Sequence, residues 1–176
     1  MAVNSNLSQQ SIPIENAGLV ILSNYINMLL VRLDLVVNHQ FKSPSAQINA
    51  LYYLQYLVKG VPETLASTLV LEKIMCGVSL STPILENIHL TDEEKVLLDG
   101  LLHAAIAYWP AIGNSSITSF RGNWLIREGL LYEKEDHWEL IVQKRVYDIL
   151  LVKAPFSFTI IKYPWMTKPI YVTWPY

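Results

Sequence analysis

The chain has 176 residues, of which 52% are hydrophobic and 16% charged, and its formal net charge is −2. This length suits a single domain, and the charged fraction lies below the roughly 25% of an average soluble domain. The low net charge argues against a broad phosphate-binding surface. The apolar excess indicates surface that a partner covers, most simply further copies of the chain.

A membrane is the competing explanation for the apolar composition. The most apolar window runs from Ala17 to Leu35 but includes four polar or charged residues: Asn24, Asn27, Arg32 and Asp34. A spanning helix needs roughly 20 nearly uncharged residues. The N-terminal segment Met1–Gln10 is polar without positive charge, unlike a signal peptide. We therefore expect no membrane insertion; binding of the first helix to a membrane surface is a weaker alternative.

In chain order, residues 1–13 predict a flexible or partner-ordered arm. A first helix is predicted from about Asn16 to Leu35, because apolar residues recur there at helical spacing. Ser43 and Pro44 then predict the N-cap and first residue of a second helix, which runs to Lys59 and stops at Gly60.

Pro62 opens a third predicted helix that ends near Cys76. Cys76 is the only cysteine and is interpreted as a small buried hydrophobe in a reducing compartment. Thr91 and Glu94 predict a capping box, which begins a fourth helix that runs to about Trp109.

The remaining predicted elements are shorter. In order, they are a helix from Ser115 or Ser116 to Arg127, strands over Leu130–Tyr132 and Trp138–Val142 joined by a turn, a short helix over Val146–Leu151, and extended pieces near Phe158–Lys162 and Ile170–Trp174. The predicted class is mainly α, an α+β fold. It comprises a compact helical domain, residues 14–176, with about five helices and a small C-terminal β-hairpin or sheet.

No motif in the sequence predicts catalytic, cofactor-binding or metal-binding residues. The four histidines are scattered and match no ligand spacing: His39, His89, His103 and His137. There is no phosphate loop, dinucleotide-binding glycine motif or nucleophile elbow. Paired carboxylates occur only in the predicted cap and hairpin turn, where they have structural explanations. We expect no cofactor and no enzymatic activity.

The helix that carries Arg121 and Arg127, followed by a hairpin, also resembles a winged-helix outline. This is the alternative function, a DNA-binding regulator. The hairpin turn at residues 133–136 is mainly acidic and repels phosphate, so the expectation is no nucleic acid. Two other roles for the arginines stay open: salt bridges with Glu128 or Glu139, and pairing between subunits.

The C-terminal segment is rich in aromatic residues, which suit the burial of area against a core or a partner. Candidate contact residues are Arg121, Arg127, Trp165, Met166, Trp174 and Tyr176. Core packing is the equal alternative for Trp165, Met166 and Trp174.

Several ordered segments together carry a family resemblance. They are Ile14–Leu22 (IENAGLVIL), Tyr53–Gly60 (YLQYLVKG), Leu69–Val78 (LVLEKIMCGV), the Leu90–Glu94 cap, Ser119–Gly129 (SFRGNWLIREG), Tyr147–Leu151 (YDILL), Ile161–Met166 (IKYPWM) and Val172–Trp174 (VTW). In this order and spacing, nearly everything after residue 13 resembles the tape measure protein family of contractile injection systems, the phage-tail-like particles of bacteria. The resemblance implies a structural, non-enzymatic component of a particle in which a contractile sheath surrounds an inner tube.

Family members often carry a long extra region before this domain. One helix of 176 residues would span about 260 Å, but the Pro and Gly stops predict short helices and a compact body with a radius of gyration of about 16 Å. The expectation is therefore a terminal adaptor at the cap, or a plug of the inner tube, rather than a full-length ruler.

The implied partners are other copies of the chain, in a trimer or hexamer ring, and inner tube, sheath, cap or terminator proteins of the same particle. The N-terminal arm, Met1–Pro13, and the aromatic end, Trp165–Tyr176, are the expected contact elements. The implied location is the cytoplasm of the producing bacterium, within an assembled particle. Release of the particle and its anchoring to a membrane both stay open.

Overall fold

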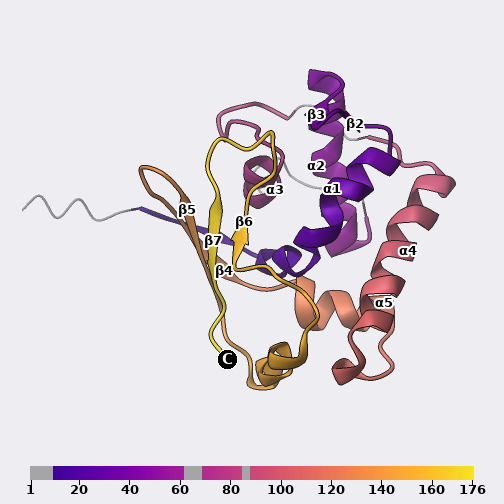
Figure 1. Ribbon diagram of the computed structural model, residues 1–176, viewed down its shortest axis with the longest axis vertical. Coiled ribbons are helices and arrows are strands. Elements are labelled where there is room, and N and C mark those ends of the chain that lie inside the picture. The colour runs from indigo at the N-terminus through magenta and orange to yellow at the C-terminus, as the bar shows by residue number, and fades with distance from the viewer. Residues whose placement is uncertain (1–9, 62–68, 85–87) are drawn as a thin grey trace, which may run out of the picture.

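The computed structural model describes residues 10–61, 69–84 and 88–176. In this part of the chain, a five-stranded sheet forms one layer and the helices pack against one of its faces (Figure 1). The α+β class is confirmed. The sheet is larger than the C-terminal element that we expected, because a strand from the N-terminal segment joins it.

The sheet brings the two ends of the described chain together. Its strands, in spatial order, are β1 (Ser11–Ile14), β4 (Gly129–Glu133), β5 (Trp138–Val142), β7 (Ile170–Thr173) and β6 (Ile160–Ile161). β5 and β7 run parallel, and the other neighbouring pairs are antiparallel. The predicted hairpin is confirmed as β4–β5, with Leu131 opposite Leu140.

Strand β1 corrects the boundary of the predicted N-terminal arm. Ser11 to Pro13, which we placed in the arm, pair with Leu130 to Tyr132 of β4. The sequence did not reveal this strand because a short edge strand depends mainly on the strand beside it. Residues 1–9 of the predicted arm lie outside the described residues.

The first predicted helix is two elements and ends early. A 3-10 helix, η1 (Ala17–Leu22), leads into α1 (Ser23–Arg32), and the α-helix does not continue to Leu35. Every residue of η1 is buried. A Cβ at Gly18 would lie 1.7 Å from the carbonyl oxygen of Trp124. Close packing against the segment around Trp124 therefore determines the conformation of η1. An amphipathic helical face does not.

A small hairpin that the sequence did not predict follows α1. It pairs β2 (Val36–Val37) with β3 (Gln40–Phe41). The two turn residues, Asn38 and His39, have φ angles of 49° and 64°. Positive φ at both positions is typical of a two-residue type I′ turn, which more often contains glycine.

The second predicted helix is confirmed as α2 (Pro44–Lys59). Ser43 Oγ accepts a hydrogen bond from Ala46 N at 3.0 Å, and Gly60 ends the helix with a φ of 75°. The described part of the third helix is α3 (Val70–Met75); its predicted start at Pro62 lies outside the described residues.

The fourth predicted helix is α4 (Asp92–Tyr108), and its capping box is confirmed. Thr91 N donates to Glu94 Oε2 at 2.8 Å, and Glu94 N donates to Thr91 Oγ1 at 3.2 Å. The short 3-10 helix η3 (Pro110–Ile112) follows.

The next predicted helix lies in the expected place but changes type. It begins as α5 (Ile117–Phe120), capped by Ser116 as expected, and continues as a π-helix, η4 (Arg121–Leu125). The short helix expected at Val146–Leu151 is the 3-10 helix η5 (Val146–Lys153). The extended pieces predicted after it contain β6 and β7.

Candidate functional site

One face of the sheet has none of the described helices over it, and we call it the open sheet face. Side chains alternate along a strand, so every second residue lies on this face. Strand register places these residues in two rows: Leu130, Ile141 and Thr173 in one, and Tyr132, Glu139, Tyr171 and Ile160 in the other. Their neighbours Leu131, Leu140 and Ile170 are fully buried against the helical layer.

The open sheet face is unusually apolar. Leu130 and Ile141 are each 38% exposed, Tyr171 is 43% exposed and Ile160 is 64% exposed. An antiparallel sheet with one face in water normally carries polar residues on that face. Apolar residues thus lie on both faces of these strands, a pattern that is more typical of a sheet covered on both sides.

A hollow of about 640 Å³ lies over the β1, β4 and β5 end of this face. Leu130 and Ile141 line it together with Pro13 of β1. Glu15, Glu128 and Gln143 add polar groups to its lining. The hollow gives the open face a concave region that could receive an apolar side chain of a partner.

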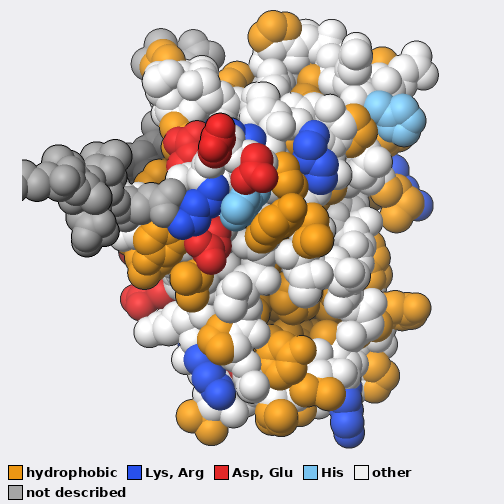
Figure 2. Space-filling model, turned by 60° about the vertical axis from the view of Figure 1, so that its left-hand side comes forward, with side chains coloured by type: hydrophobic (Ala, Val, Ile, Leu, Met, Phe, Trp, Pro, Cys, Tyr) orange, Lys and Arg blue, Asp and Glu red, His pale blue; other side chains and the backbone are white. Residues whose placement is uncertain are grey.

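Charged side chains gather beside the apolar residues, as Figure 2 shows from the sheet side. Lys168 Nζ lies 3.0 Å from Glu133 Oε1, and Lys134 Nζ lies 3.4 Å from Glu139 Oε2. His137 stacks on the Tyr171 ring at 4.5 Å. Both signs of charge are thus paired within this rim, which is typical of the polar border of an apolar interface.

The rim histidine also contacts Asp136. His137 Nδ1 lies 2.7 Å from Asp136 Oδ1. Hydrogen bonding with His137 is the largest cause that lowers the pKa of Asp136. The contact holds the histidine ring beside Tyr171, on the open face.

A second apolar surface lies where β5 leads into η5, at the lower end of the sheet in Figure 1. Val146, Ile149 and Val152 are 97%, 63% and 62% exposed. A 3-10 helix has three residues per turn, so this spacing places all three on one edge. We call them the η5 ridge.

The predicted contact residue Arg127 lies inside the chain. Its side chain is fully buried. Nη1 donates to both carboxylate oxygens of Asp148, at 2.9 and 2.7 Å, and Nη2 donates to Asn123 O at 2.7 Å. The predicted salt-bridge partners, Glu128 and Glu139, were wrong, because the η5 segment folds back and brings Asp148 to the guanidinium.

Trp174 completes this buried cluster and is also a predicted contact residue. Its Nε1 donates to Asp148 Oδ2 at 2.9 Å, and its ring lies 5.0 Å from the Arg127 guanidinium carbon. Burial alone would raise the pKa of Asp148, but hydrogen bonds from Arg127, the Arg145 backbone and Trp174 together lower it. The cluster ties η4, η5 and the end of β7 together.

Arg121 also binds within the chain. Its Nε donates to Leu57 O at 2.9 Å and its Nη2 to Tyr56 O at 3.2 Å. Asp99 on α4 is its ion-pair partner at 3.5 Å, in place of the predicted Glu128 or Glu139. The side chain thus caps carbonyls in the last turn of α2. Neither arginine of the winged-helix outline presents its guanidinium to solvent for phosphate binding.

The aromatic C-terminal residues divide between the core and the surface. Met166 and Trp174 are buried, whereas Tyr176 is 57% exposed. Trp165 is half-buried, and its Nε1 donates to Met75 O at 2.9 Å. Met166 and Trp174 therefore pack in the core, which was the alternative to a role in partner contacts.

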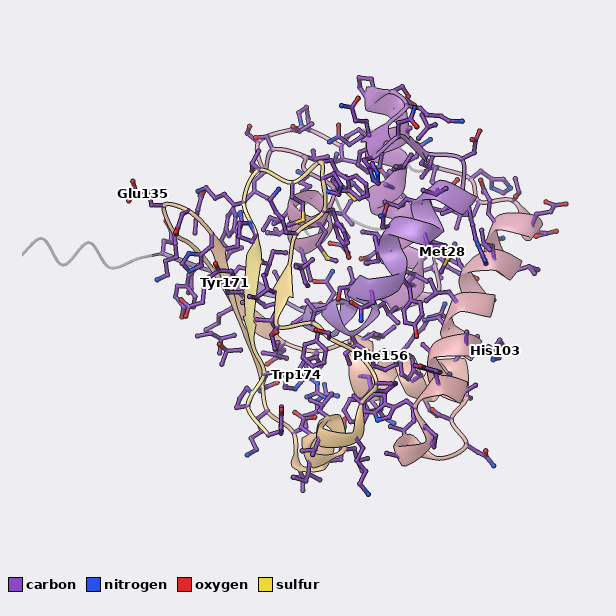
Figure 3. The ribbon with its side chains drawn as sticks, in the orientation of Figure 1. Met28, His103, Glu135, Phe156, Tyr171 and Trp174 are labelled. Carbon is purple, nitrogen blue, oxygen red and sulfur yellow. The ribbon has the colours of Figure 1, made fainter. Side chains whose placement is uncertain are left out.

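The exposed aromatic residue of β7 is Tyr171, which the sequence analysis did not select. Figure 3 shows Tyr171 on the strand and Trp174 beyond its end. The two-residue alternation of the strand could have identified Tyr171, because Ile170 and Val172 both face inward. Similarly, the apolar residues on both faces of β4 and β5 could have identified Leu130 and Ile141.

Within the described ranges, no group of three or more His, Cys, Asp or Glu side chains is placed to hold a metal ion. No described helix has both the length and the apolarity needed to cross a membrane. Cys76 is buried, as expected, and burial raises the pKa of its thiol. The open sheet face combines exposed apolar side chains with a rim of paired charges, so it is the candidate site.

Comparison with known proteins gives a match to a protein family. A family model described as "Contractile injection system tape measure protein" matches residues 3–174. No curated protein matches the chain, and no solved structure matches it.

Proposed function

The chain belongs to the contractile injection system tape measure protein family, and on this premise we propose that it is a terminal adaptor at the cap, or a plug of the inner tube. It is a component of a phage-tail-like particle, and its family implies association with other proteins of that particle. In this proposal it carries out no chemistry and acts through its surfaces.

The observation that carries the proposal is the open sheet face. Its central apolar side chains, Leu130, Ile141 and Tyr171, lie beside a rim of paired charges. Burial of apolar area is the main favourable term in protein association. A covering protein would remove these side chains from water, which supports an interface there.

The sheet edges are less suited to a partner than its face. β1 contains Pro13, which has no backbone N–H to donate to an added strand. At the opposite edge, β6 has only two residues, Ile160 and Ile161. Short or proline-containing edge strands resist pairing with another chain. A partner is therefore expected to pack on the face rather than to extend the sheet.

The shape of the described chain supports an end position rather than a measuring role. A measuring element must extend along the tube, but the longest described helix, α4, has 17 residues. At 1.5 Å per residue it spans about 26 Å. Because tube and sheath are built on rings, the chain is expected to form a matching trimer or hexamer.

The test uses particles purified from the producing bacterium. Ile141→Lys places a charge on the centre of the open sheet face, where burial against a partner would desolvate it. We expect at least a tenfold loss of the chain from purified particles, measured by quantitative mass spectrometry against an inner-tube protein. The soluble level and the melting temperature of the variant should stay near those of the wild type.

Val96→Lys is the matched control. Val96 is 72% exposed and lies on α4, in the helical layer, on the other side of the molecule from the sheet (Figure 1). This variant is expected to enter particles normally. Normal incorporation of Ile141→Lys, or loss of Val96→Lys instead, would contradict an interface on the open sheet face.

A further inference from the structure

Asn16 and Glu72 form a buried polar pair where the N-terminal segment meets α3. Asn16 is 3% exposed and Glu72 is fully buried. Asn16 Nδ2 donates to Glu72 Oε1 at 2.6 Å. This is a short hydrogen bond between residues 56 positions apart in the chain, so it fastens two distant segments together.

Each member of the pair has a second oxygen that lacks a partner. Asn16 Oδ1 and Glu72 Oε2 are both buried, and neither has a hydrogen-bond partner among the described residues. A buried acceptor without a donor destabilises a fold, because the hydrogen bonds that it made to water in the unfolded chain are not replaced. An ionised Glu72 would leave two such acceptors in one place, and one of them would carry negative charge.

The charged groups nearby do not neutralise Glu72. Lys59, at the end of α2, attracts the carboxylate, but its ammonium lies 3.8 Å from Glu15 and its side chain is one-third exposed. Lys73, the next residue of α3, donates to Leu80 O and Thr82 O. Cys76, which directly follows the last residue of α3, is a buried thiol. Within the described chain, Glu72 has no ion-pair partner.

We propose that Glu72 is a neutral carboxylic acid in the folded protein at neutral pH, and that its proton closes a reciprocal acid–amide pair with Asn16. A proton on Glu72 Oε2 turns this oxygen into a hydrogen-bond donor. Asn16 Oδ1, the other unpartnered oxygen of the pair, is the acceptor for that proton. The existing bond from Asn16 Nδ2 to Glu72 Oε1 supplies the other half. One proton thus satisfies both unpartnered oxygens.

The balance of forces on the carboxyl agrees with this geometry. Burial raises the pKa of Glu72 to about 8, although its own backbone N–H, the Asn16 amide and Lys59 each lower it. The desolvation cost of a buried carboxylate is larger than the stabilisation that the backbone N–H, the Asn16 amide and Lys59 give to the charged form. The group therefore keeps its proton through neutral pH.

This pair acts as a pH-sensitive latch at the junction of the two layers. Asn16 lies between β1 and η1, and the next residue, Ala17, donates its N–H to Arg127 O at 2.8 Å. Ionisation of Glu72 above about pH 8 breaks the acid–amide pair and leaves a buried charge there. The N-terminal strand then separates more readily from the helical layer.

Glu72→Gln tests the latch, because a carboxamide has the donor and acceptor of the protonated acid and cannot ionise. The unfolding equilibrium constant of each protein is measured in urea from pH 5 to pH 9. The unfolding equilibrium constant of the wild type, divided by that of Glu72→Gln, should rise about tenfold per pH unit until about pH 8 and then level off. Glu135→Gln, in the exposed hairpin turn, is the matched control and should follow the wild type.

A second measurement keeps the proposal testable if Glu72→Gln does not fold. In wild-type protein labelled with carbon-13 at glutamate side chains, the Glu72 carboxyl resonance should titrate near pH 8. An ordinary glutamate titrates at about pH 4.3. Titration of Glu72 in that ordinary range, or parallel stability curves for wild type and Glu72→Gln, would overturn the proposal.

Discussion

At the scale of single residues, the buried Arg127–Asp148 pair has the largest expected effect on stability. Arg127→Met leaves Asp148 buried without the guanidinium whose Nη1 donates to both of its carboxylate oxygens. The loss of one member of a buried pair typically costs about 3–5 kcal/mol. We expect a loss of that size, measured by urea unfolding at pH 7.

The double variant Arg127→Met with Asp148→Leu separates the orphaned charge from lost packing. It removes both charges, so it should be more stable than Arg127→Met alone. A double variant that is less stable than either single variant would contradict this explanation.

The two buried carboxyl groups give opposite pH dependence. The pKa of Asp148 is lowered in the folded chain, so its contribution is complete above its unfolded pKa and is lost as pH falls through the folded value. The pKa of Glu72 is raised, so its contribution is complete below its unfolded pKa and is lost as pH rises towards about 8. Stability should therefore be greatest in mildly acidic solution, as thermal unfolding across pH 3–9 would measure. A maximum above pH 8 would contradict these assignments.

At the scale of elements, the capping box of α4 gives a local prediction. Thr91→Ala removes the hydroxyl that accepts from Glu94 N, and should cost about 1 kcal/mol of unfolding free energy. Thr91→Ser keeps this acceptor and is the control. Equal losses for the two variants, measured by urea unfolding, would show that the hydroxyl is not responsible.

The elements that the sequence predicts well are those with local signals. Ser43, Pro44 and Gly60 bound α2, and Thr91 with Glu94 begins α4, because each contact lies within one helical turn. Strand β1 and the parallel β5–β7 pair depend on segments far apart in the chain. The register of such pairs is not encoded within any short window, so the sequence analysis did not predict it.

The same distinction between local signals and long-range contacts applies to the candidate contact residues. Selection by residue type chose Arg127, Met166 and Trp174, which the fold places in the interior. These residues are buried because η5 and β7 fold back against earlier parts of the chain. No local sequence pattern predicts such long-range contacts. Tyr171 was predictable in principle from alternation along β7, whereas the hollow above Leu130 and Ile141 depends on the sheet order.

At the scale of the whole molecule, the fold has two layers, and no described helix covers the outer face of the sheet layer. The helical layer covers the inner face of the sheet, and the apolar open face and the η5 ridge remain at the surface. Membership of the contractile injection system tape measure family places the chain among proteins that assemble with others. We therefore expect these exposed surfaces to be buried in the particle.

The most direct test is a cryo-electron microscopy map of the assembled particle at a resolution that separates β-strands. We expect this two-layer fold at one end of the inner tube, with Leu130, Ile141 and Tyr171 covered by a neighbouring protein chain. A map that places the fold in the particle with these three side chains facing solvent would contradict an interface on the open sheet face, as would particles that lack the chain entirely.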